Sequence, residues 1–348
     1  MGCNFPLHAF DTGFLTDKGK PLYKIVGRDI EWIYQPVGPG SKKVYIDRKI
    51  TNYKEIPCGK CIGCRLSYSK EWANRCLLES KGWANNYFIT LTYKPEELPI
   101  NEELGNATLQ PKDLQDFMKR LRIEWQRKHG HDNVRFFGCG EYGSKTRRPH
   151  YHIIAFNLPL FDLEELKKTR NGDILYYSRD LERIWGNGNV WVGEVNWNTC
   201  AYVARYIMKK QKGPDAKDWY EQNGENPEFV RMSRRPGIAW QYFQDNKEEI
   251  YKYDEIRIEK RRKVKKFENF RNNLETVKES IKPCRYYDNL YDMEDHEFME
   301  ALKKSREQRA KANVEMMMSK TTLTRNEYLE EKERRLKESI KALKRNIE

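Results

Sequence analysis

The amino-acid sequence predicts an α+β protein, and three observations support that prediction. Residues 87–93, YFITLTY, alternate β-branched and aromatic side chains, which is typical of a strand. Residues 111–128 repeat large apolar side chains at helical spacing, which predicts an amphipathic helix. Residues 134–139 and 150–156 predict two more strands, joined by the polar loop EYGSKTRRP. The centre of the chain is therefore expected to combine a sheet with helices.

Further elements are expected on both sides of these segments. Residues 1–57 contain short strand-like pieces, LYKIVG, EWIYQPV and KKVYID, between Gly and Pro turns. The other predictions, in chain order, are a helix over 65–80, a charged helical stretch within 161–185 interrupted by Gly172, a strand over 189–195, a helix over 199–211, and globular structure as far as Phe243.

The composition changes near residue 246. From there on charge is dense, and runs such as EKRRKVKKF contain few side chains of core size. We expect this tail to be helical or partly disordered, either as a solvated helix face or as an arm that contacts DNA. The predicted organisation is thus an N-terminal region of strands and cysteines packed on the core (1–83), a core (84–245) and a charged tail (246–348).

The charge balance indicates a polyanionic partner. Lys and Arg number 65 against 52 Asp and Glu, which gives a net charge of +13, and 21 Tyr, nine Trp and 14 Phe could stack on unpaired bases. Together these properties favour nucleic-acid binding over a protein that is merely basic and soluble. No apolar run reaches the ~18 residues of a membrane span and no signal peptide is evident, so we expect a cytoplasmic protein without a membrane partner.

A histidine pair suggests a metal site. In RRPHYHIIAF, His150 and His152 stand two residues apart in a predicted strand, so both imidazoles project from one face and Tyr151 from the other. Glu141 ends the preceding strand, and a hairpin would bring its carboxylate beside the histidines. Such a ligand set leaves positions for water and a phosphate oxygen and suits Mn²⁺ or Mg²⁺. The alternative is a pair of polar surface residues.

A second motif, CAYVARYIMKK, places two tyrosines on one helix face. Tyr202 and Tyr206 are four residues apart, with Arg205 and Lys209 on a neighbouring face and Lys210 beyond. Phenol is a poor nucleophile at neutral pH because its pKa is ~10, but a metal at the phosphate and nearby cations would overcome this. Attack on DNA would leave a phosphotyrosine ester that keeps the bond energy for religation. Taken alone, such tyrosines are more often core residues.

A third motif is rich in cysteine. Cys58, Cys61 and Cys64 form C-x₂-C-x₂-C before a predicted helix, a spacing at which thiolates can wrap one soft metal ion. We expect a structural zinc in a reducing compartment; an iron–sulfur cluster and a metal-free packed loop are the alternatives. The candidate fourth ligands are Cys3, Cys76 and His8, of which we adopt Cys3.

Together, YFITLTY, PHYHIIAF and YVARYIMKK resemble, in this order, the signature of the HUH endonuclease superfamily. The GEYG, PCGKCIGC and HAFDTGF runs are similar to those of the replication initiators of gokushovirus-type microviruses, which are small single-stranded DNA bacteriophages. The matching segments are scattered from the N-terminus to about Gln211. The resemblance implies an RRM-like core, in which a central antiparallel sheet with flanking helices carries the histidines on a central strand.

The resemblance also implies roles for individual residues. His150 and His152 would bind the metal with Glu141 as third ligand, and Tyr202 and Tyr206 would act as alternating nucleophiles. Tyr206 and Lys209 match the Tyr-x-x-Lys pattern of single-tyrosine relatives, so Lys209 would assist at the phosphate. The position between the histidines is usually a bulky apolar residue and is Tyr151 here, whose ring can still pack against the sheet. The predicted DNA-binding residues are Arg147, Arg148, Arg205 and Lys210.

The sequence therefore predicts a rolling-circle replication initiator that nicks single-stranded origin DNA through a covalent 5′-phosphotyrosine intermediate and then religates it. No G-x-x-x-x-G-K-[ST] motif is present, so a host helicase is expected to separate the strands, with a host polymerase as a further partner. The location would be the cytoplasm of the bacterial host. The alternative function is a noncatalytic, zinc-stabilised protein that binds single-stranded nucleic acid. Relaxases and transposases of the same superfamily are a nearer alternative, disfavoured by the microvirus-like flanking motifs.

Overall fold

A computed structural model describes residues 2–17, 19, 21–26, 33–36, 43–46, 54–130, 133–143, 146–169, 173–205, 216–265 and 272–344. The chain divides into two compact units, whose boundaries fall within two helices. Unit 1 comprises residues 1–68 and 310–346, and unit 2 comprises residues 69–309 and 347–348. The predicted boundaries after residues 83 and 245 stay a prediction.

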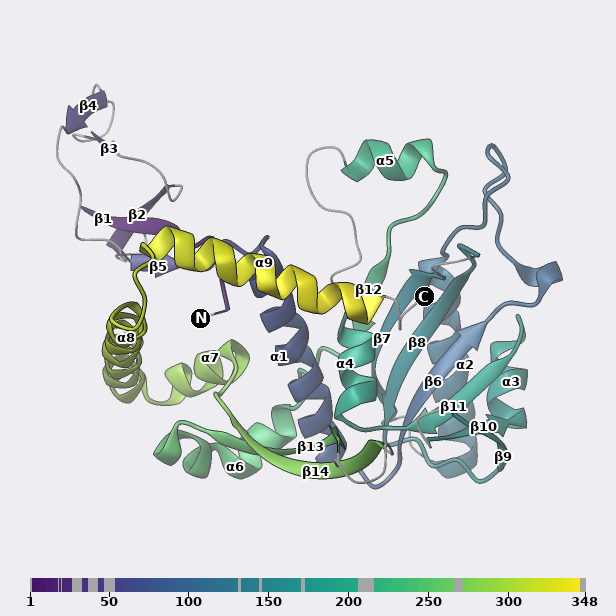
Figure 1. The fold of residues 1–348 in the computed structure, drawn as a ribbon. Coiled ribbons are helices and arrows are strands. Elements are labelled where there is room, and N and C mark those ends of the chain that lie inside the picture. The colour runs from purple at the N-terminus through teal and green to yellow at the C-terminus, as the bar shows by residue number, and fades with distance from the viewer. Residues whose placement is uncertain are drawn as a thin grey trace. The chain divides into compact units, whose positions relative to one another are not determined.

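Unit 1 contains small antiparallel sheets and helical segments from both ends of the chain (Figure 1). Its elements are β1 (Leu7–Leu15), β2 (Pro21–Val26), β3 (Ile33–Pro36), β4 (Lys43–Ile46), β5 (Lys54–Ile56), the start of α1 (Ile62–Lys81), the end of α8 (His296–Met318), and α9 (Arg325–Lys344). The strands pair in the order β2-β1-β5, while β3 and β4 form a separate hairpin. The Nδ2 atom of Asn4 donates a 2.6 Å hydrogen bond to Glu333 of α9, which ties the N-terminal segment to the C-terminal helix.

Unit 2 is built on a seven-stranded antiparallel sheet of order β12-β7-β8-β6-β11-β10-β9. Its elements are β6 (Asn86–Thr92), the 3₁₀ turn η1 (Pro95–Glu97), α2 (Pro111–His129), β7 (Arg135–Tyr142), β8 (Pro149–Phe156), β9 (Leu163–Lys168), β10 (Ile174–Ser178), α3 (Arg179–Trp185), β11 (Val190–Glu194), α4 (Trp197–Arg205), α5 (Ala216–Gln222), β12 (Phe229–Met232), α6 (Trp240–Tyr253), β13 (Ile256–Lys265), β14 (Asn272–Ile281) and α7 (Arg285–Glu294). The structure confirms the predicted α+β class with a cysteine cluster and C-terminal helices.

Helices cover both faces of this sheet, because side chains of successive strand residues alternate between two apolar cores. On β8, Tyr151 and Ile153 enter the core beneath α2 and α3, whereas Ile154 and Phe156 enter the core beneath α1, α4, α6 and α7. Figure 1 shows α4 on one side of the sheet and α2 and α3 on the other. His150 and His152 lie four and two residues before Ile154 on this strand, so their side chains point to the same face of the sheet as Ile154, the face that α4 covers.

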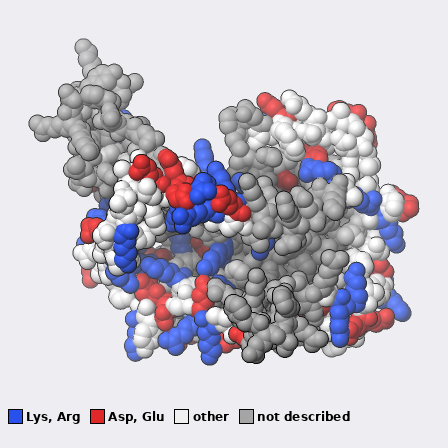
Figure 2. All heavy atoms as spheres, in the orientation of Figure 1, with Lys and Arg blue, Asp and Glu red and all other residues white. Residues whose placement is uncertain are grey.

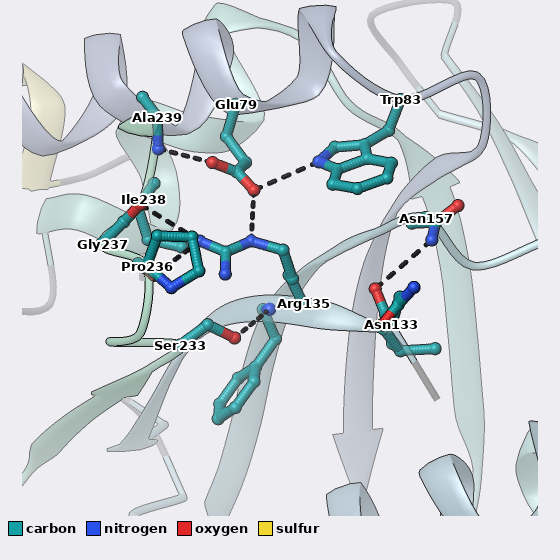
Figure 3. Close-up of polar contacts among 12 residues, drawn as sticks. Glu79, Trp83, Asn133, Arg135, Asn157, Ser233, Pro236, Gly237, Ile238 and Ala239 are labelled. Carbon is teal, nitrogen blue, oxygen red and sulfur yellow. Dashed lines mark hydrogen bonds and ion pairs between the residues drawn. The ribbon is translucent and has the colours of Figure 1, made fainter. Parts of the chain in front are cut away.

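A buried carboxylate connects α1 to β7 (Figure 3). Glu79 of α1 is 5% exposed and accepts hydrogen bonds from the Nε atom of Arg135 at 2.6 Å and from the indole of Trp83 at 3.1 Å. It also accepts one from the backbone N–H of Ala239, at the start of α6. Because the buried charge is paired and hydrogen-bonded, it fixes the helix on its strand without an unsatisfied group.

Two segments differ from the elements predicted for them. Residues 163–168 and 174–178 form the hairpin β9–β10 and residues 179–185 form α3, whereas a charged helical stretch interrupted by Gly172 was expected within residues 161–185. The charged side chains of β9 are tolerated because this strand lies at the sheet edge. Within the tail, residues 256–265 form a strand, in which Ile256, Ile258 and Lys260 are buried in alternation with exposed residues. That two-residue period is hidden by the basic character of the segment.

Candidate functional site

Strand pairing sets the position of three metal-ligating side chains on unit 2. In the β7–β8 ladder Glu141 lies opposite His150 and Cys139 lies opposite His152. Residues that face each other across a ladder point to the same side of the sheet, so the carboxylate and both imidazoles lie on the face that α4 covers. The hairpin expected from the sequence thus brings the three predicted ligands together.

The ligand atoms have a spacing that suits one ion. The Oε1 atom of Glu141 lies 2.8 Å from Nε2 of His150 and 3.0 Å from Nε2 of His152. Adjacent ligands at ~2.1 Å from an octahedrally coordinated ion are ~3.0 Å apart. Glu141 and His152 are 2% and 4% exposed, while His150 is half-buried and is thus the most exposed of the three. The three residues could hold a metal ion.

Neighbouring groups hold both imidazoles with Nε2 toward Glu141. The Nδ1 atom of His150 lies 3.2 Å from the carbonyl oxygen of Arg148, which can only accept a hydrogen bond. The Nδ1 atom of His152 lies 3.0 Å from the hydroxyl of Thr90, its partner on β6, and Phe88 stacks on the same ring. Such partners fix ring orientation and tautomer in metal sites. The sequence analysis missed Thr90. Its pairing with His152 depends on the register between β6 and β8, which no local sequence motif indicates.

The charge of Glu141 is stabilised despite its burial. Burial alone would raise the pKa of this carboxyl, but the hydrogen bonds with His150 and His152 outweigh that effect and hold the pKa well below its usual range. The carboxylate therefore stays ionised at neutral pH. An ionised carboxylate between two imidazoles is a ligand set that attracts a divalent cation.

Tyr202 lies beside this site. It belongs to α4, and its half-buried ring makes edge-to-face contacts with His152 at a centroid distance of 5.0 Å and with Phe88 at 6.0 Å. A helix packed on the histidine face therefore places the ring of one predicted nucleophile against one predicted ligand, His152. Arg205 is the last described residue of α4. The other predicted residues of this motif, Tyr206, Lys209 and Lys210, lie outside the described residues.

Two of the predicted DNA-binding arginines have partners inside the protein. The Nε atom of Arg147 donates a 3.0 Å hydrogen bond to Glu225, and its guanidinium lies 4.8 Å from the ring centroid of Tyr142. Arg148 donates to the carbonyl oxygen of Tyr93 at 3.0 Å. Both contacts hold the β7–β8 loop that carries the Arg148 carbonyl.

On the face drawn in Figure 2, Lys and Arg side chains are interspersed with Asp and Glu.

The cysteines of unit 1 form a second cluster. The Sγ atoms of Cys58 and Cys64 are 4.0 Å apart, and those of Cys61 and Cys3 are 3.8 Å apart. A tetrahedron with metal–sulfur bonds of ~2.3 Å has edges of ~3.8 Å, so the four sulfurs could hold one ion. Backbone N–H groups donate to three of these sulfurs. Burial alone would raise the pKa of Cys61, but the N–H groups of Asn4 and Cys64 help to lower it to about 7.

Gly63 has no side chain, and this allows the N-terminal segment to bring Cys3 close to the other three cysteines. A Cβ atom on Gly63, in the first turn of α1, would lie 1.7 Å from the carbonyl oxygen of Gly2. The N-terminal segment therefore packs directly on the start of α1. Of the candidate fourth ligands, the structure brings Cys3 into the cluster, whereas Cys76 is fully buried in the apolar core of unit 2. The role of Cys3 as a ligand stays a prediction.

Comparison with known proteins gives a family for this chain. A family model described as replication-associated protein ORF2/G2P matches residues 86–211. The chain is 35% identical over 295 residues to replication-associated protein ORF2 of Spiroplasma virus 4, a match that covers 84% of this chain and 85% of the relative. The chain belongs to the family of gokushovirus replication-associated proteins. The resemblance seen in the motifs is confirmed.

Other relatives match shorter parts of the chain. Replication-associated protein VP4 of Bdellovibrio phage phiMH2K is 38% identical over 48% of this chain and 53% of its own length. Replication-associated protein ORF4 of Chlamydia phage 1 is 34% identical over 44% of this chain and 38% of its own length. No solved structure matches the chain. Among the described residues, no helix is long and apolar enough to cross a membrane.

The family segment covers one of the two clusters. Residues 86–211 include Glu141, His150, His152 and Tyr202, whereas the four cysteines lie outside this range. The segment that matches the family model thus contains the histidine site and the helix that carries Tyr202.

Proposed function

We propose that this replication-associated protein is a metal-dependent endonuclease that nicks single-stranded origin DNA and remains attached to it through a phosphotyrosine. One observation carries the proposal: Glu141, His150 and His152 converge on the sheet face against which Tyr202 packs, with its ring 5.0 Å from that of His152. Ligands and nucleophile are thus adjacent although they come from different elements. Membership in a replication-associated family is consistent with this activity.

The residues divide the chemistry between them. The Tyr202 oxygen attacks the scissile phosphorus, a Tyr–O–P bond forms and the P–O3′ bond breaks. The phenolic proton passes to solvent, the 3′ oxygen leaves as a hydroxyl, and the 5′-phosphate remains on the tyrosine. A divalent metal bound by the histidine site would polarise the phosphate and stabilise its developing charge. Religation is the reverse attack by a 3′-hydroxyl on the phosphotyrosine, so no external energy source is required.

The two clusters would take different ions. Two imidazoles and one carboxylate suit Mn²⁺ or Mg²⁺, which accept mixed N and O ligands and keep positions for water and phosphate. Four thiolates at tetrahedral spacing suit a structural zinc. The zinc would support the fold of unit 1 and take no part in cleavage.

Two tyrosines would allow two successive cuts. In the proposed cycle one phenol opens the origin and the other cuts the regenerated origin after one round of synthesis. Tyr206 follows Tyr202 by four residues and would take the second role, with Lys209 at the phosphate and Arg205 and Lys210 on the DNA backbone. A host helicase and a host polymerase would supply strand separation and synthesis.

The direct test is formation of a covalent adduct. A labelled single-stranded oligonucleotide that carries the viral origin is incubated with the protein and Mn²⁺, and a denaturing gel resolves protein joined to label. We expect an adduct that chelation of the metal prevents. Each single change, Tyr202→Phe or Tyr206→Phe, should leave some adduct, and the double variant should leave none. The Phe ring keeps the packing against His152, so folding should survive.

Three outcomes would redirect this proposal. An adduct in the double variant would mean that another residue is the nucleophile. Tight binding of single-stranded DNA without any adduct would favour a noncatalytic, zinc-stabilised binding protein instead. Complete loss of adduct in one single variant would identify a one-tyrosine enzyme, for which the Tyr-x-x-Lys pattern favours Tyr206.

A further inference from the structure

A buried lysine lies beneath the helix that carries Tyr202. Lys260 belongs to β13, in the two-stranded sheet β13–β14, and is 6% exposed. An ammonium group removed from water is costly unless charges and hydrogen bonds compensate for the lost hydration. The neighbours Ile256 and Ile258 on the same strand are part of the apolar core that α4 also enters. The lysine is therefore held at a fixed depth by its strand.

The partners of Lys260 connect three elements. Its Nζ atom donates a 2.6 Å hydrogen bond to Glu279 of β14 and lies 4.2 Å from the ring centroid of Trp197, a distance typical of a cation–π contact. Glu279 also accepts a hydrogen bond from Lys70 of α1 at 3.0 Å. The hydrogen bond from Lys260 lowers the pKa of Glu279 to about 2, so this carboxylate is charged at neutral pH.

Trp197 is the first residue of α4, and its ring is held in two directions. The face of the ring meets Lys260, and its indole N–H donates a 2.8 Å hydrogen bond to Asn74 of α1. The backbone at this point is held as well, because Oδ1 of Asn196 accepts hydrogen bonds from the N–H groups of Asn198 and Thr199. The start of α4 is thus fixed in both side chain and backbone.

This fixed point is close to the proposed nucleophile. Tyr202 follows Trp197 by five residues, which is ~7.5 Å along a helix axis. A helix of this length is stiff, so a shift or rotation at Trp197 moves Tyr202 by a similar amount. A displacement of ~1 Å in a reacting group can cost ~100-fold in rate. The position of Trp197 is therefore coupled to the reaction geometry at His152.

We propose that Lys260 is a positioning residue for cleavage: from the β13–β14 hairpin it fixes Trp197, and with it the place of Tyr202 beside the histidine site. This inference rests on the proposed nicking function. Lys260 lies beyond residue 211, where the match to the family model ends, so the family segment alone would lack this support. The hairpin is accordingly a functional part of the nuclease and more than an appended basic arm.

The test is the variant Lys260→Met in the full chain, which keeps the length of the stem and removes the charge. Glu279 keeps Lys70 as a partner, so the variant should fold. The matched control is Arg257→Met, the same exchange of a cation for Met on the same strand, at a side chain that is 75% exposed. For each protein we would measure the adduct-forming rate constant with Mn²⁺ and origin DNA at saturation, the affinities for Mn²⁺ and DNA, and the melting temperature.

We expect Lys260→Met to change the cleavage rate but not the binding of Mn²⁺ or DNA. Lys260→Met should lower the saturated rate constant by about 10- to 100-fold, while both affinities and the melting temperature stay within error of the wild type. Arg257→Met should match the wild type in every measurement. Lys260→Arg retains a cation that can lie over Trp197 and pair with Glu279, so it should recover most of the rate.

Each other outcome has a defined meaning. An unchanged rate in Lys260→Met overturns the inference and leaves the nicking function standing. Equal losses in Arg257→Met would reveal a general effect of positive charge, and a loss of Mn²⁺ affinity or thermal stability in Lys260→Met would reveal a merely structural role. Both results reject positioning. If the wild-type protein forms no adduct although it binds Mn²⁺ and DNA, the nicking function itself fails.

Discussion

The four-cysteine cluster and the histidine site both gather metal-ligating atoms, but they do so with opposite ligand sets. The cluster in unit 1 offers four sulfur atoms, which fill the coordination of a tetrahedral ion from the protein alone. The site in unit 2 offers two imidazole nitrogens and one carboxylate oxygen, which leave places for water or substrate. The first set is complete without a substrate and the second is not.

The groups that surround the two metal-ligand sets also differ. Next to the histidine site lies Tyr202, the proposed nucleophile, whose ring contacts His152. Around the cysteines, backbone N–H groups donate hydrogen bonds to the sulfurs of Cys3, Cys58 and Cys61. The comparison teaches that ligand number and neighbouring groups together separate a structural role from a chemical one. The predictions below test that separation.

The largest effect is expected from His150→Ala. Loss of one of three protein ligands should abolish adduct formation, because the remaining pair holds a divalent ion weakly. Binding of DNA should persist, since phosphate contacts by basic residues supply most of that affinity. The measurement pairs the adduct gel with fluorescence anisotropy of a labelled oligonucleotide. Cleavage at the wild-type rate would remove the metal mechanism.

The next effect is expected from Cys61→Ser. Removing one thiolate should take the bound zinc from ~1 ion per chain to near zero in metal analysis and lower the melting temperature. Cleavage by the fraction that remains folded should continue, because none of the four clustered cysteines belongs to the histidine site. The matched control is Cys200→Ser, at a buried cysteine outside the cluster, which should keep the zinc. Full zinc content in Cys61→Ser would show that these cysteines do not share an ion.

A smaller effect is expected from Thr90→Val. Valine has nearly the shape of threonine but offers no oxygen to Nδ1 of His152, which lies 3.0 Å from the hydroxyl. Loss of such a partner costs ~10- to 100-fold in metal affinity. Thr90→Ser restores the hydroxyl and should bind Mn²⁺ with nearly wild-type affinity. Titration calorimetry with Mn²⁺ makes the comparison; equal affinities for the valine and serine variants would exclude an orienting role for Thr90.

The sequence could predict that Glu141, His150 and His152 lie together, because the determinants of this arrangement are local. The two-residue period of a strand places His150 and His152 on one face, and a hairpin returns Glu141 to them. The outer contacts could not be predicted, since Thr90 meets His152 across a ladder whose register depends on the whole sheet. The cysteine motif was equally local for three sulfurs. The fourth sulfur, that of Cys3, joins them because residue 2 packs closely against Gly63, and the spacing of cysteines in the sequence does not predict such packing.

The tail was the hardest region to predict. Charged residues dominate residues 256–265, and their alternation with Ile256 and Ile258 was obscured because the buried position that follows is Lys260. A buried lysine breaks the apolar pattern on which strand prediction depends, and it is satisfied here by Glu279 and Trp197 from other elements. The exception to the pattern thus marks a place where tertiary contacts outweigh local preference.

The smallest effect is expected from Arg147→Met, measured against Arg205→Met. A side chain that neutralises one phosphate lowers the slope of log affinity against log salt by ~1 when it is removed. Arg205, three residues after Tyr202 on α4, should show that loss if it contacts DNA. Arg147 already pairs with Glu225, whose side chain is 8% exposed, and stacks on Tyr142, so a phosphate contact would first have to break a neutralised pair. We therefore expect Arg147→Met to leave the salt slope unchanged, with anisotropy titrations at several salt concentrations as the measurement. A fall of ~1 for Arg147→Met would instead make Arg147 a DNA contact, as its sequence position first indicated, and would place the opening of the Arg147–Glu225 pair in the binding step.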